Sequence, residues 1–143
     1  GERFASTPAG LEPLLRELAP NIIHEGYAPD RETYAELLGS ADVVASTALH
    51  EFFGMAVAEG LAAGCTPVVP NRLSYPEVLG AELSLFLYEE GQLADRLTLL
   101  AQDPSALRES GRREHMRQRA RSWSAEETCL QLDDLADRLQ SKL

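Results

Sequence analysis

A helix-length run with a single charge constrains this sequence more than any other stretch. From Gly54 to Ala63 every residue is apolar or small except Glu59. A helix that is apolar on all sides is expected to be buried, and a carboxylate inside it is costly unless a partner hydrogen-bonds it. A second carboxylate, Glu51, stands eight residues before Glu59. We therefore expect the two carboxylates to face a polar ligand at the N-terminus of this helix, where backbone N–H groups also favour an anion.

A structural role for Glu59 is the alternative. The side chain could cap a neighbouring loop or pair with an arginine, because ion pairs also account for isolated carboxylates in apolar surroundings. The spacing of the two glutamates does not by itself separate these interpretations.

Composition describes an ordinary globular chain. Its 143 residues are 44% hydrophobic and 25% charged, which fits one domain with a sizeable core. No apolar run approaches the ~20 residues that span a bilayer, and no signal-peptide pattern is present. The two cysteines do not indicate a disulfide framework or a metal site. We therefore expect a cytoplasmic protein with no membrane partner.

The order of predicted elements is that of a parallel α/β sheet. Helices alternate with short apolar strands, which are expected at residues 21–24, 42–46, 66–70 and 85–88. Continuous β-branched runs without alternation are typical of strands that are covered on both faces. The strand–helix–strand order favours right-handed crossovers. The sequence thus predicts a parallel sheet with helices on both faces and further helices appended at its C-terminal end.

Three predicted loops meet at one edge of this sheet. Ligands of open α/β sheets bind beyond the carboxyl ends of the strands, and the loops that leave those ends are residues 26–29, 47–54 and 71–75. Glu51 and the start of the apolar helix both fall at this edge. Their position favours the ligand interpretation over the structural one.

A family resemblance is carried by Glu51-Phe52-Phe53-Gly54, by Glu59 and by Pro67-Val68-Val69. These residues resemble the E-x7-E signature of the retaining glycosyltransferases of family 4. That family has the GT-B fold, in which two Rossmann-like halves enclose the active site. The resemblance covers nearly the whole chain and implies that residues 1–143 form a single domain, the C-terminal, donor-binding half. It also implies that the first strand–helix unit and the N-terminal half are missing from this chain.

A subgroup is indicated by two longer stretches, Ser46–Gly54 and Arg72–Glu77. They are similar to mannosyltransferases that use GDP-mannose and act on queuosine in tRNA. Most of family 4 has a Gly-Gly pair before the Pro-Glu, where this chain has Leu73-Ser74-Tyr75. The resemblance implies transfer of a hexosyl group, mannose from GDP-mannose, to an acceptor hydroxyl with retention of configuration.

The resemblance also implies roles for individual residues. Glu59 matches the carboxylate that accepts both ribose hydroxyls of the nucleotide, two donors that suit two ionised acceptor oxygens. Glu51 matches the carboxylate that holds the donor sugar beside the reacting carbon, which makes it the candidate catalytic residue. The backbone N–H groups that would bind the sugar and the distal phosphate are those of Phe53, Gly54 and Met55. The loop that would lie along the base contains Gly26 and Tyr27.

Cofactors and macromolecular partners follow from the same comparison. The family needs no metal ion, and no D-x-D pair occurs in this chain, so we expect no metal site and no cofactor besides the nucleotide-sugar substrate. The family's diphosphate-binding Lys has no counterpart, because Lys142 is the only lysine. We therefore expect the chain to need its own N-terminal half for turnover. The net charge of −10 argues against nucleic-acid binding by this chain alone, so a tRNA acceptor would be held by the full-length enzyme.

Two alternatives remain open at this stage. The first is a non-catalytic Rossmann-like binding or scaffold domain. The second concerns the six arginines between Arg108 and Arg121, which form either a solvated helix face or a ridge that contacts RNA phosphates.

Overall fold

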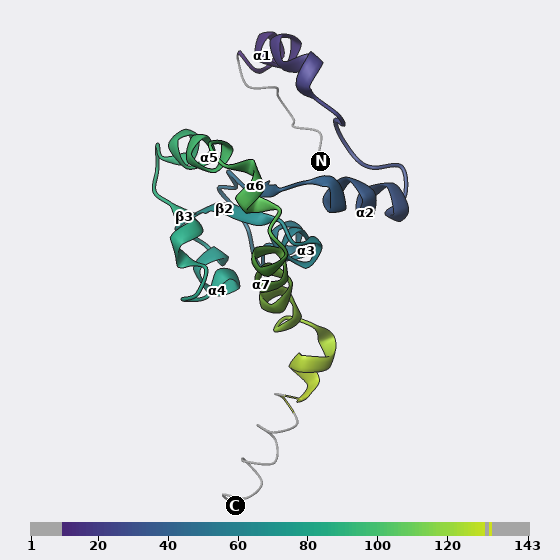
Figure 1. The fold of residues 1–143 in the computed structure, drawn as a ribbon, viewed down its shortest axis with the longest axis vertical. Helices are drawn as coiled ribbons and strands as arrows, with labels where there is room; N and C mark the ends of the chain where they lie inside the picture. The colour runs from purple at the N-terminus through teal and green to yellow at the C-terminus, as the bar shows by residue number, and fades with distance from the viewer. Residues whose placement is uncertain (1–9, 131, 133–143) are drawn as a thin grey trace, which may run out of the picture. The chain divides into compact units, whose positions relative to one another are not determined.

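A three-stranded parallel sheet forms the centre of the computed structural model, which describes residues 10–130 and 132 (Figure 1). The strands are β1 (Val43–Ala45), β2 (Thr66–Pro70) and β3 (Leu87–Tyr88), in the order β1-β2-β3. Val43 pairs with Thr66, and Val69 pairs with Leu87. All five residues of β2 are buried, as expected for a strand covered on both faces. The predicted parallel α/β fold is confirmed.

Helices cover both faces of this sheet. Successive strand residues point to opposite faces. Val69 belongs to the core cluster that also contains Val57 and Leu61 of α3 (Met55–Ala63). Val68 instead lines a pocket with Leu100 of α5 (Leu93–Ala101). The helices α3 and α5 therefore pack on opposite faces of β2.

One glycine allows α3 to lie very close to β1. A Cβ atom at Gly60 would stand 2.7 Å from Cγ1 of Val44. That distance is shorter than any normal carbon–carbon contact, so a residue without a side chain is required there. The helix ends at Gly64, whose φ of 91° is the left-handed conformation that glycine adopts at helix C-termini.

The remaining helices follow the sheet in chain order. They are α4 (Tyr75–Leu79), the 3-10 turn η2 (Ser84–Phe86), α5, α6 (Pro104–Leu107) and α7 (Ser110–Arg121). Residues 125–130 are also helical. The core that α3, α4 and α7 share with β2 comprises Val57, Leu61, Val69, Tyr75, Val78, Leu79, Leu83, Phe86 and Met116. Within the described part of the chain, no helix is long and apolar enough to cross a membrane.

The chain divides into two compact units, Gly1–Tyr34 and Ala35–Leu143. The first contains α1 (Leu11–Leu18), the turn η1 (Ala19–Asn21) and the start of α2 (Arg31–Ser40). Asp30 begins α2, since its carboxylate accepts a 2.7 Å hydrogen bond from the backbone N–H of Thr33. The single domain expected over residues 1–143 stays a prediction.

The strand predicted at residues 21–24 is wrong. Pro20 lies in η1, and the backbone N–H of Ile22 donates to the carbonyl of Ala19, which closes this turn instead of joining a ladder. Ile23 is 91% exposed. The strand predicted at residues 85–88 is shorter than expected, because the N–H of Phe86 likewise closes η2 by donating to the carbonyl of Leu83. Local turns therefore replace strand pairing at both places.

Two arginines of α7, Arg113 and Arg119, bind helix C-termini. The guanidinium of Arg113 donates to the carbonyl of Ala63, the last residue of α3, over 3.0 Å. That of Arg119 donates to the carbonyls of Val78 (2.8 Å) and Glu77 (2.6 Å), in the last turn of α4. The last carbonyls of a helix lack intrahelical partners and carry partial negative charge, so cations stabilise them.

Further arginines near α7 form ion pairs. Arg108 makes a two-pronged contact with Asp42, with N–O distances of 2.8 to 3.1 Å, and Arg121 pairs with Glu114 over 2.9 Å. The segment from Arg108 to Arg121 therefore combines arginines that hold the fold together with arginines whose side chains are exposed, Arg108 at 68% and Arg121 at 67%. The solvated face is thus present in part, and contact with RNA phosphates stays a prediction.

Candidate functional site

The carboxyl ends of the three strands meet at one edge of the sheet, which we call the strand-end edge. Residues 46–54 leave β1, residues 71–74 leave β2, and residues 89–92 leave β3. The sequence correctly placed the first two loops at this edge. The other predicted loop, with Gly26 at a φ of 89° and Tyr27 73% exposed, belongs to the first compact unit.

A hydrogen-bonded cluster of hydroxyls ties the loops of the strand-end edge together. The hydroxyl of Ser46, directly after β1, lies 2.6 Å from the phenolic oxygen of Tyr75 at the start of α4. The phenol of Tyr88 in β3 donates to the Ser46 carbonyl over 2.8 Å. Burial raises the pKa of Tyr75; the bond to Ser46 opposes this, and the negative charge of Glu51 adds to it. The base of the edge is therefore a neutral and preorganised network.

Glu51 folds over the turn that precedes α3. Its Oε1 atom accepts hydrogen bonds from the backbone N–H groups of Phe52 (3.0 Å) and Phe53 (3.3 Å). Phe52 is fully exposed, whereas the ring of Phe53 packs edge-on against Trp123 at 5.3 Å. The amide of Phe53 and the carboxylate of Glu51 were both predicted to bind the sugar. In this structure they are hydrogen-bonded to each other.

Gly54 begins α3 in a conformation that favours glycine. Its φ is 91°, and a Cβ atom would stand 3.2 Å from Cε1 of Tyr75. The N–H groups of Val57 and Ala58 both donate to the Gly54 carbonyl at 2.9 Å. The preceding N–H of Met55 therefore lies before the first intrahelical bond, where helix amides need partners from outside the helix.

The expectation that α3 is buried on all sides, with Glu59 inside it, is wrong. Val57, Gly60 and Leu61 are buried, but Met55 is 60% exposed and Glu59 is also exposed. The sheet and α7 pack against the buried sides, and the side that bears Met55 and Glu59 is exposed. The apolar composition of α3 therefore does not mean that the helix is buried on all sides. One of its sides is exposed and carries the carboxylate of Glu59.

A pocket of about 370 Å³ at the same edge is lined by residues to which the sequence assigned no role in binding. Its lining residues are Thr47, Leu49, Pro70, Asn71, Arg72, Tyr88, Glu89, Glu90, Gly91 and Leu93. Asn71 donates to the carboxylate of Glu89 over 2.7 Å, and Arg72 donates to the carbonyl of Ala48 over 3.2 Å. Most of these residues lie just after the predicted strands. Their position in the sequence was the feature from which a role at this edge could have been predicted.

Ser74 has an unpartnered hydroxyl at this edge. The oxygen is buried, lacks a hydrogen-bond partner among the described residues, and lies 3.8 Å from the Cβ position of Gly54. Ser74 precedes α4, but its side chain makes no capping hydrogen bond and its backbone is already helical (φ −77°, ψ −14°). A capping hydroxyl requires an extended backbone, so the hydroxyl cannot reach the helix amides.

The described residues contain no cluster of three or more His, Cys, Asp or Glu side chains that could hold a metal ion. The polar groups gathered at the strand-end edge are carboxylates, amides and hydroxyls, which can form hydrogen bonds with an organic ligand.

Comparison with protein families identifies the family of this chain. It belongs to the family of glycosyl transferases group 1, whose model matches residues 12–123. The parallel sheet with its polar strand-end edge is thus a domain of this glycosyl transferase family.

Individual relatives are mannosyltransferases. The chain is 39% identical over 82 residues to tRNA-queuosine alpha-mannosyltransferase of Drosophila melanogaster, which covers 57% of this chain and 22% of the relative. It is 40% identical over 57 residues to GDP-mannose-dependent alpha-(1-6)-phosphatidylinositol dimannoside mannosyltransferase of Mycobacterium tuberculosis, which covers 40% of this chain and 15% of the relative. The chain thus spans less than a quarter of the length of these relatives. No solved structure matches it significantly.

Proposed function

We propose that this chain is the donor-binding half of a retaining glycosyltransferase of the GT-B type, with GDP-mannose as donor and queuosine in tRNA as acceptor. The observation that carries the proposal is that Glu51 and the start of α3 lie together at the strand-end edge, with Glu59 on the exposed side of the same helix. Family membership supports the reaction class, and the names of both relatives support mannose as the sugar. The Drosophila relative supports the tRNA acceptor.

Glu59 is proposed to bind the nucleotide ribose. It lies one helical turn from Met55, on the exposed side of α3. Its two carboxylate oxygens match two vicinal hydroxyl donors, and the charge strengthens both hydrogen bonds. An exposed position costs no desolvation before the donor arrives, so the observed geometry suits a ligand-binding carboxylate better than the buried one that sequence composition suggested.

Glu51 is proposed to hold the donor sugar. One oxygen, Oε1, accepts both amide hydrogen bonds and so fixes the carboxylate. The second oxygen has no partner among the described residues and can accept a sugar hydroxyl. The amides of Gly54 and Met55 would receive the distal phosphate, and that of Phe53 would do so after a shift of Glu51. The partial positive charge of the α3 N-terminus stabilises negative charge on the leaving diphosphate.

Partners and cofactors are part of the proposal. We propose that no metal or prosthetic group takes part and that Gly26 and Tyr27 lie along the base. The chain's own N-terminal half would cover the strand-end edge, where Leu49 is 70% exposed and Phe52 is fully exposed. The tRNA acceptor would reach the donor through that assembled enzyme in the cytoplasm.

Calorimetric titration of the full-length enzyme with GDP-mannose tests the donor site. Glu59→Ala is expected to weaken binding about ten- to hundred-fold, the loss of one or two hydrogen bonds to a charged group. Glu36→Ala, an exposed carboxylate on α2, is the matched control and should bind like wild type. Equal donor affinity in wild type and Glu59→Ala would contradict the assignment of Glu59.

The acceptor and the stereochemistry need a separate assay. Transfer of labelled mannose to tRNA containing queuosine should occur with wild type and be lost in Glu51→Gln, and proton NMR of the product should show the donor's anomeric configuration. A scaffold domain, the second candidate, would bind neither GDP nor GDP-mannose. An inverted product would exclude the retaining mechanism.

A further inference from the structure

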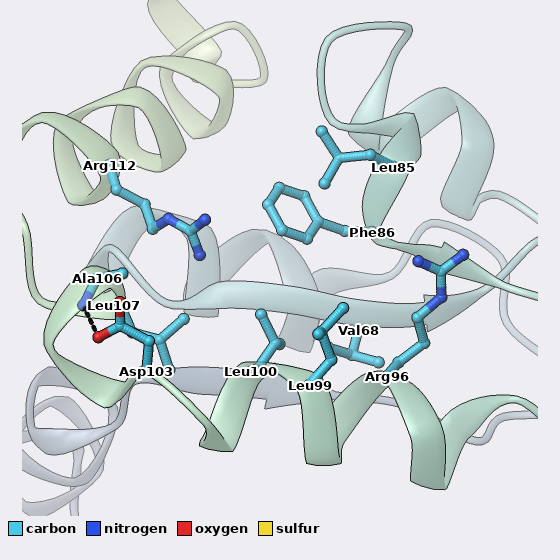
Figure 2. Close-up of a pocket in the computed structure, with 10 residues that line it drawn as sticks. All are labelled: Val68, Leu85, Phe86, Arg96, Leu99, Leu100, Asp103, Ala106, Leu107 and Arg112. Atoms are coloured by element: carbon cyan, nitrogen blue, oxygen red, sulfur yellow. Dashed lines mark hydrogen bonds between the residues drawn. The ribbon is translucent and has the colours of Figure 1, made fainter.

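A second pocket lies outside the strand-end edge and shares no residue with the proposed donor site. Its volume is about 270 Å³, and β2, η2, α5, α6 and α7 all contribute to it (Figure 2). The lining residues are Val68, Leu85, Phe86, Arg96, Leu99, Leu100, Asp103, Ala106, Leu107 and Arg112.

The centre of this pocket is apolar. Figure 2 shows Leu99 and Leu100 of α5 directed toward the ring of Phe86. Leu99 is 59% exposed, and Leu85 on the other side of the pocket is 62% exposed. An apolar ligand that covered these exposed leucine side chains would gain about 25 cal/mol of free energy for each Å² of apolar surface removed from water.

The two ends of the pocket differ in charge. Arg96, Leu99 and Leu100 follow the i, i+3, i+4 spacing of one face of α5. Asp103 lies beyond the end of α5, as the N-cap of α6, and Figure 2 shows it at the opposite end of the pocket from Arg96. The pocket therefore has a cationic end at Arg96 and an anionic end at Asp103.

At the anionic end the charges are already engaged. The Asp103 carboxylate accepts hydrogen bonds from the N–H of Ala106 (3.1 Å) and the hydroxyl of Ser105 (2.5 Å). Hydrogen bonding to Ser105 is the main cause that lowers the pKa of Asp103, and the charge of Arg112 contributes. The Arg112 guanidinium also lies 5.7 Å from the centre of the Phe86 ring.

At the cationic end Arg96 is half-buried, and its guanidinium has no hydrogen bond or ion pair to any residue that the structure describes. A partly desolvated cation beside apolar surface favours an anion that brings its own apolar body. The site is unusual in a chain of net charge −10, whose overall field repels anions.

We propose that this pocket binds a small, free amphipathic carboxylate. Its anionic group pairs with Arg96, and its apolar body lies over Leu99 and Leu100 against Phe86. The volume falls just below the ~300–1,000 Å³ of drug-sized sites, so the ligand has on the order of ten heavy atoms. The inference does not depend on the proposed donor site.

Titration of the full chain with octanoate, followed by calorimetry and by NMR of leucine methyl groups, tests the proposal. Arg96→Met should weaken octanoate binding at least about ten-fold, the loss of a charge-assisted contact. Arg96→Lys should stay within a few-fold of wild type, because it keeps the charge. Arg121→Met removes an exposed arginine that is paired elsewhere and should leave the affinity unchanged.

Three further ligands separate the contributions of the carboxylate charge and of the apolar tail, and test whether the pocket is distinct from the donor site. Octyl glucoside keeps the tail without the charge, acetate keeps the carboxylate without the tail, and both should bind at least about ten-fold more weakly than octanoate. Excess GDP should not displace octanoate, because the donor site is elsewhere. Equal affinity for octyl glucoside, unchanged binding by Arg96→Met, or binding only to vesicles of anionic phospholipid would each overturn the proposal.

Discussion

Replacing Arg119 with methionine tests the arginine contacts that hold helix ends to α7. The guanidinium donates to the carbonyls of Val78 and Glu77 over 2.8 and 2.6 Å, and it lies 5.3 Å from the ring of Trp123. Methionine keeps most of the apolar stem. The substitution therefore removes the charge and its hydrogen bonds while disturbing the packing little.

The expected loss follows from these contacts. Hydrogen bonds to charged groups contribute about 1.5–3 kcal/mol each, and an exposed cation–π contact about 0.5–1 kcal/mol. Arg119 is only half-buried, and water can replace part of these interactions. We therefore expect Arg119→Met to lower the free energy of unfolding by ~2–3 kcal/mol.

Urea unfolding followed by circular dichroism measures this difference. Arg121→Met is the matched control, because Arg121 is on the same helix but pairs with Glu114 at the surface, where an ion pair contributes about 0–1 kcal/mol. If the two variants unfold at the same urea concentration with equal slopes, the arginine–carbonyl contacts do not stabilise the fold as argued.

Two further predictions concern the turn before α3 and the ion pair between Arg108, at the end of α6, and Asp42, just before β1. Gly54→Ala should lower the free energy of unfolding by about 2 kcal/mol, because the left-handed conformation costs ~1–2 kcal/mol and the new methyl group crowds Tyr75; thermal unfolding within ~1 °C of wild type would contradict this. The hydrogen bond from Arg108 holds the pKa of Asp42 below its ordinary value. The ionised Asp42 therefore stabilises the folded state above the unfolded-state pKa of about 3.9. This stabilisation is lost as the pH falls through the lower pKa of the folded state. Urea midpoints between pH 6 and pH 2 should therefore fall more steeply for wild type than for Arg108→Met, and parallel curves would exclude the linkage.

The sequence predicted the centre of the fold well because apolar runs there find pairing partners. The run at Val43–Ala45 pairs with the buried run at Thr66–Pro70, and Gly64 ends α3 by its left-handed conformation. The segment at residues 21–24 has the same apolar character, but Pro20 and the Ala19–Ile22 turn determine its backbone. Strand formation there depended on a pairing partner, which composition cannot show.

The order of strands and loops predicted that Glu51 lies at the edge, whereas the exposure of Glu59 could not be read from the sequence. The roles of both residues in binding stay predictions. A helix with few charges is expected both for a fully buried element and for one that leaves a face open. The carbonyl partners of Arg113 and Arg119 were also out of reach, because they lie 41 to 50 residues away in sequence.

The contact between Gly60 and Val44 determines how precisely α3 can present its open face. With no side chain at position 60, the height of the helix above β1 is set by rigid backbone and by a valine that has few rotamers. Any larger residue would have to lift the helix by about 0.7 Å to restore an ordinary 3.4 Å contact, and Glu59 is the adjacent residue. Displacements of ~1 Å can slow an enzymatic step a hundred-fold. Gly60 therefore fixes the distance between α3 and β1, and with it the position of the Glu59 carboxylate relative to the sheet.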